Sequence, residues 1–216
     1  MRKEVFLKDE YYHIYNRGVD KRVVFFDDRE RTRFVNTLYL LNNFQDIPAN
    51  FDPIMLRPRD VLIPRDPIVE VVAACLMPNH YHLAVCGLSD GAISKFLHKV
   101  GVSYTMYFNK RHERSGALFE GSFKARHIDK GEYATYLTKY IHFNPYPLFQ
   151  TKSGIMLDDL VSYPWSTLND YVGGESRFSH VVNTDFRDTI LGMNAREYGA
   201  YCSGAFNDLK QDSFQT

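Results

Sequence analysis

Two apolar runs separated by a turn dipeptide are the clearest structural signal in the chain. Residues 68–76 are almost continuously apolar, whereas residues 80–85 alternate between histidine or alanine and larger apolar side chains. Pro78 and Asn79 lie at the junction, and such residues between two β-rich segments are typical of a tight turn. The pattern predicts an antiparallel hairpin. The aromatic residues 11–17 predict a further strand earlier in the chain.

Three segments carry an apolar residue every three to four positions, which is the period of a helix that packs one face on a core. The first begins at Asp27, and Glu30 three residues later completes the pattern of a capping box. We expect this helix to end near Asn42. The second segment follows Gly91, and the third follows a capping residue, Asp129. The stripe positions are Phe34, Leu38 and Leu41, then Ile93, Leu97, Val100, Tyr104 and Phe108, then Tyr133, Tyr136, Leu137, Tyr140 and Ile141.

The order of these elements predicts the fold class. Residues 117–119 and 122–128 flank a Glu-Gly pair and predict a second hairpin. The chain then reads strand, helix, two strands, helix, strand and helix. This order matches an α+β fold of the ferredoxin-like kind, in which an antiparallel sheet carries helices.

The chain changes character after its first two thirds. We expect a main domain at residues 1–147 and a small C-terminal helical appendage at residues 148–216, with Trp165 as the anchor between them. The Pro-rich residues 45–67 predict a long loop or ordered excursion within the main domain.

Charge and composition permit a nucleic-acid partner without demanding one. The 216 residues carry no net charge, but residues 1–150 hold 21 Lys and Arg against 17 Asp and Glu, and residues 151–216 hold 5 against 9. The main part of the chain is therefore mildly basic. No apolar run reaches the roughly 18 residues of a membrane span, and the three cysteines have no C-x-x-C spacing. We expect a cytoplasmic protein that does not contact membranes.

Two histidines on the second predicted hairpin strand are candidate metal ligands. Side chains alternate along a strand, so His80 and His82 point to one face while Tyr81 and Leu83 point to the other. Two imidazoles side by side can share one metal ion. The alternative is a pair of ordinary histidines at a strand start.

Tyr140 and Asn144 are four residues apart and share one face of the third predicted helix. An amide on an apolar stripe needs a partner if it is buried, and a metal ion is one such partner. The alternatives are core packing for Tyr140 and a helix C-cap for Asn144. Alternatively, the histidine pair belongs to a metal hydrolase or a cupin-like metal-binding protein. Such a site needs a further metal ligand, for which His13 is the candidate.

Several ordered blocks of sequence resemble the IS200-type transposase domain. They are residues 12–18, 77–82, 116–125 and 140–145, and residues 163–166 with 170–173 resemble the tail of the REP-associated tyrosine transposase branch. The family continues Asn-Pro-Val-Arg where this chain has Asn144-Pro145-Tyr146-Pro147, so a basic residue near the site is absent.

The resemblance implies a function. The family belongs to the HUH single-strand endonucleases, in which two histidines bind a divalent metal and one tyrosine attacks DNA. It implies that His80, His82 and Asn144 hold Mg²⁺ or Mn²⁺ and that Tyr140 is the nucleophile. The expected activity is a metal-dependent single-stranded DNA endonuclease and strand transferase that forms a 5′-phosphotyrosine on hairpin-containing DNA. The appended tail favours a monomer over a homodimer.

Single-stranded DNA requires basic side chains beside aromatic stacking surfaces. The candidates are Arg17, Arg22, Lys124 and Arg126, with Tyr15 and Phe123. The alternative function is a non-catalytic, domesticated regulatory protein that binds nucleic acid.

Overall fold

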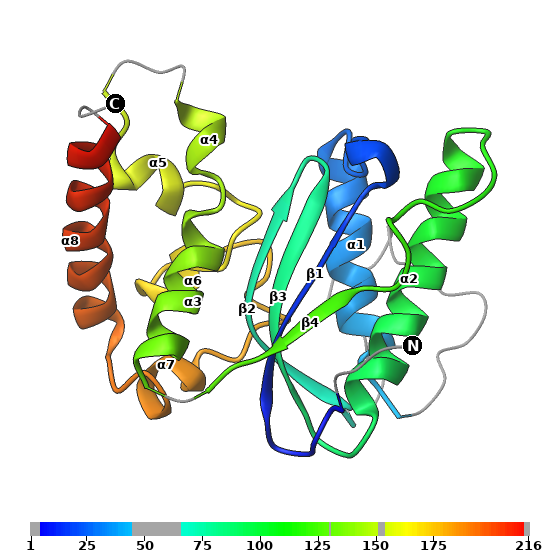
Figure 1. Ribbon diagram of the computed structural model, residues 1–216, viewed down its shortest axis with the longest axis horizontal. Coiled ribbons are helices and arrows are strands. Elements are labelled where there is room, and N and C mark those ends of the chain that lie inside the picture. The colour runs from blue at the N-terminus through cyan, green and yellow to red at the C-terminus, as the bar shows by residue number, and fades with distance from the viewer. Residues whose placement is uncertain (1–4, 45–65, 130, 151–153, 214–216) are drawn as a thin grey trace.

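The computed structural model describes residues 5–44, 66–129, 131–150 and 154–213, the last five of these as backbone only. A four-stranded antiparallel sheet occupies the middle of the molecule (Figure 1). Its strands are β1 (Tyr11–Arg17), β2 (Val69–Met77), β3 (His80–Gly87) and β4 (Lys124–His127). They lie in the order β2-β3-β1-β4, which is the ferredoxin-like order, and the predicted α+β fold class is confirmed. The predicted Pro-rich excursion lies almost entirely outside the described residues.

Helices cover both faces of this sheet. Helix α1 (Asp28–Leu41) and helix α2 (Ala92–Arg111) pack on one face, and helix α3 (Glu132–Phe143) packs on the other (Figure 1). None of the described helices combines the length and the apolar character needed to cross a membrane.

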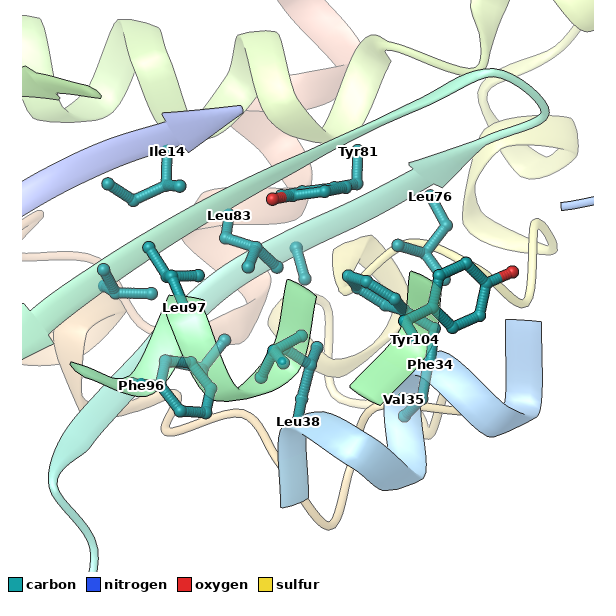
Figure 2. Packing of buried hydrophobic residues seen from close by; sticks show 14 of the residues in the cluster. Ile14, Phe34, Val35, Leu38, Leu76, Tyr81, Leu83, Phe96, Leu97 and Tyr104 are labelled. Carbon is teal, nitrogen blue, oxygen red and sulfur yellow. The ribbon is translucent and has the colours of Figure 1, made fainter. Parts of the chain in front are cut away.

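The larger core forms between the sheet and the first two helices. Figure 2 shows Tyr81 and Leu83 of β3 packed toward Phe34 of α1 and Tyr104 of α2. All four side chains are at least 95% buried. Because neighbouring residues of a strand point to opposite faces, this packing turns His80 and His82 toward the face that carries α3.

The predicted second hairpin is wrong. Only β4 forms a strand there, and Phe119 makes one isolated bridge to Gly18. The amide of Glu120 bonds to the carbonyl of Arg17, so the chain continues the end of β1 and does not turn back on β4. Leu118 and Phe119 are held in place by burial in the larger core.

Of the two predicted helix N-caps, Asp27 is confirmed and Asp129 is wrong. The Asp27 carboxylate accepts from the Glu30 amide at 2.9 Å, as expected of an N-cap. The Glu30 carboxylate, however, accepts from Phe26 and not from the capping residue. The expected Asp129 cap is wrong, because α3 begins at Glu132 and Gly131 occupies its N-cap position. Asp129 lies 3.2 Å from His127 instead.

The C-terminal part of the chain packs along β2. Its described residues form five further helices: α4 (Tyr146–Phe149), α5 (Leu157–Val161), α6 (Leu168–Tyr171), α7 (Asp185–Thr189) and α8 (Ala195–Ser213). Residues 165–167 bond to the outer edge of β2, through Leu76 N to Trp165 O and Thr167 N to Ala74 O. The indole N–H of the buried Trp165 donates to Asp28 at 3.2 Å, which confirms the anchor.

Helix α3 is tied to this C-terminal part by a buried histidine. His142 Nδ1 lies 2.8 Å from the Tyr198 hydroxyl of α8, and its Nε2 lies 2.9 Å from the Thr167 hydroxyl. Burial lowers the pKa of His142 to about 3, so the ring is neutral near pH 7. The contact fixes α3 between β2 and α8.

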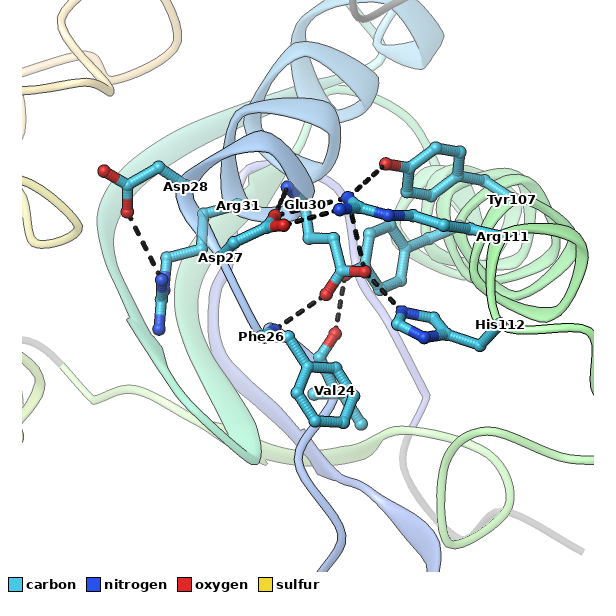
Figure 3. Close-up of polar contacts among 10 residues, drawn as sticks. Val24, Phe26, Asp27, Asp28, Glu30, Arg31, Tyr107, Arg111 and His112 are labelled. Atoms are coloured by element: carbon cyan, nitrogen blue, oxygen red, sulfur yellow. Dashed lines mark hydrogen bonds and ion pairs between the residues drawn. The ribbon is translucent and has the colours of Figure 1, made fainter.

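A buried carboxylate ties α1 to α2 (Figure 3). Glu30 is fully buried and accepts from the Phe26 amide at 2.7 Å and from His112 Nε2 at 2.5 Å. Arg111 approaches the same carboxylate at 3.4 Å and pairs with Asp27 at 2.5 Å. The start of α1 is thereby fixed against the end of α2.

We predict that Glu30→Ala lowers the free energy of unfolding by about 2–4 kcal/mol, because it leaves the Phe26 amide and His112 without their acceptor. Urea denaturation at pH 7.5 measures the change. Lys8→Ala removes an exposed ion pair with Asp9 and should stay within about 0.5 kcal/mol. A similar small effect for Glu30→Ala would contradict the assigned role.

The His142 contact predicts a pH dependence of stability. The unfolded chain binds a proton near the ordinary pKa of 6.5, and the folded chain binds it only near pH 3. Stability is therefore complete above about pH 6.5 and falls as the pH is lowered toward 3. Between pH 7.5 and 5.5, the free energy of unfolding of His142→Asn should fall by about 1 kcal/mol less than that of the unaltered chain.

Candidate metal and nucleophile site

The predicted histidine pair lines a pocket between the sheet and α3. The pocket has a volume of about 240 Å³, and its lining residues are Tyr15, Asn16, Arg17, His80, His82, Glu120, Lys124 and Tyr140. A larger cavity, of about 550 Å³, lies between α2 and residues 117–123. His80, His82 and Tyr140 do not line it. The smaller pocket therefore contains the candidate chemistry.

Strand pairing explains why the polar side chains gather here. Arg17 of β1 pairs with His80, Tyr15 pairs with His82, and Lys124 of β4 pairs with Tyr15. Paired residues in an antiparallel sheet point to the same face, so these five side chains share one surface.

The donor atoms at His80 fit a cation. The His80 Nδ1–H donates to the Asn79 oxygen at 2.7 Å, since the Asn79 amide group donates to Lys21 O. A neutral imidazole carries one N–H, so His80 Nε2 presents a lone pair. That nitrogen lies 2.9 Å from the side-chain oxygen of Asn144, which is also an acceptor. Two opposed lone pairs repel unless a proton or a cation lies between them, and N and O donors are suitable ligands for Mn²⁺ or Mg²⁺.

Both histidines are neutral near pH 7. Burial lowers the pKa of His80; the nearby Asn144 oxygen opposes the shift, and the charge of Arg17 adds to it. Burial and then the neighbouring His13 and His80 lower the pKa of His82 to about 3. Metal ligation requires neutral imidazole, so both groups are in the required state.

His13 of β1 contacts His82 directly. The two rings are stacked with centroids 5.1 Å apart, and His13 Nε2 shares a 2.8 Å hydrogen bond with His82 Nδ1. Burial and then Arg126 lower the pKa of His13 to about 4. Only Nε2 of His82 remains to face the pocket. The bond to His82 also occupies His13 Nε2, which disfavours the hydrolase reading with His13 as a third ligand.

Helix α3 brings Tyr140 to this pocket. Its ring centroid lies 5.5 Å from that of His82 and 6.2 Å from that of His13, and the side chain is 42% exposed. Its hydroxyl has no hydrogen-bond partner in the described part of the chain, so the alternative of core packing does not hold. Asn144 occupies the C-cap position of α3, as the alternative expected, and its side chain also reaches His80.

A clamp formed by residues 18–25 holds the turn before His80. Pro78 O accepts from the amides of Val24 and Phe25, and Asn79 O accepts from Gly18. A Cβ at Gly18 would lie 2.4 Å from the carbonyl of Arg22, so only glycine fits. The 3₁₀ helix η1 (Val19–Lys21) forms the outer part of this clamp.

The predicted DNA-binding residues separate into groups. Arg17 and Lys124 line the pocket, and Lys124 lies 3.9 Å from Glu120 and 5.9 Å from the Tyr15 ring. Arg126 lies farther along β4, against the ring of Tyr133 at 4.8 Å.

Two further candidates lie away from the pocket. Arg22 is not among the pocket residues and pairs with Asp20 at 3.6 Å. Phe123 packs near Phe6 on the face of the sheet that carries α1 and α2, with ring centroids 6.1 Å apart.

Three polar residues at the site carried no signal in the sequence. Asn79 orients His80, but in the sequence it is an ordinary turn residue. Glu120 and Asn16 also line the pocket. The sequence predicts only a turn at Glu120 and a strand at Asn16. Their roles depend on long-range contacts, such as Asn16 Nδ2 to Gly121 O at 3.1 Å.

Comparison with known proteins gives a similar fold and a family match over part of the chain. No curated protein sequence matches the chain. Among solved structures, a REP-associated tyrosine transposase bound to a REP hairpin matches over 86% of this chain and 89% of its own, with a TM-score of 0.54 and 13% sequence identity. At that identity the likeness concerns the fold.

The family model described as IS200-like transposase matches residues 63–144, which include His80, His82, Tyr140 and Asn144. The expected resemblance is confirmed over this segment: residues 63–144 are similar to the IS200-like transposase family.

Proposed function

We propose that the chain is a metal-dependent single-stranded DNA endonuclease and strand transferase that acts through a 5′-phosphotyrosine intermediate. One observation carries the proposal. The phenol of Tyr140 lines the same pocket as His80 and His82, and its hydroxyl is not used in packing. A nucleophile and a set of cation ligands thus face one space.

His80 Nε2, His82 Nε2 and the Asn144 oxygen are the proposed ligands of Mg²⁺ or Mn²⁺. When bound there, a divalent ion polarises a phosphate oxygen and stabilises the charge that develops on it. Asn79 and His13 are positioning residues. Asn79 bonds to Nδ1 of His80 and His13 bonds to Nδ1 of His82, so the Nε2 atoms of His80 and His82 remain for the metal ion.

Tyr140 forms the covalent link. Its oxygen attacks the phosphorus, the new O–P bond forms, and the bond to the 3′ oxygen breaks. The phenol proton passes to water, and the departing 3′ oxygen takes a proton to become a 3′-hydroxyl. The same hydroxyl, or that of another strand, can reverse the step, so no nucleotide cofactor is required.

Hairpin-containing DNA is the proposed substrate. Arg17 and Lys124 supply positive charge in the pocket lining. The REP-associated tyrosine transposase of similar fold was solved bound to a REP hairpin. The ligands and the nucleophile come from one chain, which supports a monomer with its own tyrosine in its own site.

We predict that Tyr140→Phe forms no covalent adduct with a labelled hairpin oligonucleotide in Mn²⁺, while its affinity for that DNA stays within about twofold. Denaturing gels detect the adduct, and native gels detect binding. Tyr136→Phe, one turn earlier on α3, loses a hydroxyl but keeps its aromatic ring, so it is the matched control and should form the adduct normally. An adduct with Tyr140→Phe means that the nucleophile is another residue.

The same assay separates the proposal from its alternative. A non-catalytic regulatory protein would retain the hairpin without cleaving it, in the unaltered chain as well as in the variant. That outcome would replace the proposed enzyme with a binding protein.

We predict that His13→Phe weakens Mn²⁺ binding by about 10–100-fold, because it keeps an aromatic ring but removes the nitrogen that fixes His82. Electron paramagnetic resonance of free Mn²⁺ measures the affinity. Tyr15→Phe, whose ring also stacks on His82 at 5.8 Å, is the control and should bind Mn²⁺ within about twofold. Equal affinity for His13→Phe would show that His13 only packs.

A further inference from the structure

Helix α3 carries two aromatic side chains beyond the pocket: Tyr136 is exposed, and Tyr133 is half-buried against the smaller core. Tyr133, Tyr136 and Tyr140 are spaced by three and then four residues, so they follow one edge of the helix over about 10 Å. The opposite side of the helix, with Ala134 and Ile141, is buried on the sheet. Tyr136 is 53% exposed, which is unusual for a large aromatic side chain with no packing role.

A cation lies against each of the two outer rings. The Arg126 guanidinium is 4.8 Å from the Tyr133 centroid, and the Lys139 ammonium is 5.3 Å from the Tyr136 centroid. Neither cation forms an ion pair within the ranges that the structure describes. Their charge is therefore available to an anion.

We propose that Tyr133 and Tyr136, with Arg126 and Lys139, form a stacking site for unpaired bases of single-stranded DNA that leads outward from the pocket along α3. We call these four residues the α3 stacking surface. The inference rests on the proposed function, because it extends the path of the strand that Tyr140 cleaves.

The chemistry of this surface selects a single strand. Aromatic faces stack on bases, and bases expose their faces only where they are unpaired. Lysine and arginine beside each ring match the phosphate that follows each base. The acidic residues Asp129 and Glu132 lie at the start of α3 and limit the surface at that end, and Asp129 already pairs with His127.

The surface is continuous with the pocket. Tyr140 lies one turn after Tyr136 and belongs to the pocket lining, and Lys124 and Tyr15 extend the same face across β4 and β1. A strand whose phosphate reaches Tyr140 therefore has an adjacent path on which to lie.

Fluorescence anisotropy with a labelled oligothymidylate tests the proposal. Tyr136→Ala should weaken binding by about tenfold or more while leaving the dependence on salt unchanged, because stacking and not charge is lost. Lys139→Ala should weaken binding and reduce the slope of log affinity against log salt by about 0.7.

The chain offers a matched control pair. Lys95 lies 5.6 Å from the ring of Phe44, which is 45% exposed and lies outside the α3 face of the sheet. Phe44→Ala and Lys95→Ala should bind the oligothymidylate as the unaltered chain does. A duplex of equal length should be insensitive to Tyr136→Ala.

Three outcomes overturn the proposal: no binding of the single strand, unchanged affinity for Tyr136→Ala, or an equal loss for the duplex. The adduct assay is scored separately. If Tyr136→Ala weakens binding and Tyr140→Phe still forms an adduct, the stacking surface stands and the assigned nucleophile fails. If Tyr136→Ala binds normally, the surface is refuted whatever the adduct assay gives.

Discussion

The alternation of side chains along β3 is the constraint on which the site depends. Tyr81 and Leu83 are buried against α1 and α2, and burial of such side chains contributes about 1.5–3 kcal/mol each. A shift of one residue in the pairing would move His80 and His82 into that apolar core. The hydrophobic face of the strand therefore sets the direction of both imidazoles without contacting the pocket.

A second constraint acts on the helix that carries the phenol. His142 holds α3 to Thr167 and Tyr198, and Thr167 is itself bonded to Ala74 of β2. The contacts lie on the side of α3 away from the pocket, so they orient Tyr140 and leave its ring accessible. A division of the chain at residue 147 stays a prediction. Trp165 nevertheless packs in the same core as α1 and α2, so the C-terminal part is joined closely to the sheet.

Much of this arrangement follows from local sequence. The period of apolar residues predicted three helices and the first hairpin, and strand alternation placed His80 and His82 on one face. The helical spacing of Tyr140 and Asn144 likewise predicted a shared edge of α3. These features depend on neighbours within a few residues, which is why the sequence is informative about them.

Contacts between distant segments account for the rest. The segment around Glu120 was predicted as a turn, but its backbone pairs with Arg17, about a hundred positions earlier in the chain. His13 reads as part of an aromatic strand, and only the register of β1 against β3 reveals its bond to His82. Arg22 and Phe123 are candidates for DNA contact by residue type, one basic and one aromatic, but the fold places them away from the pocket.

The backbone bonds between β2 and residues 165–167 bear on solubility. An outer strand with unpaired N–H and C=O groups is a template for intermolecular association, and β2 is a long, almost entirely apolar strand. Trp165 and Thr167 occupy those groups at Leu76 and Ala74. The opposite outer strand, β4, is only four residues long and carries Lys124 and Arg126. The sheet is thus protected from aggregation by a cover on one side and by shortness and charge on the other.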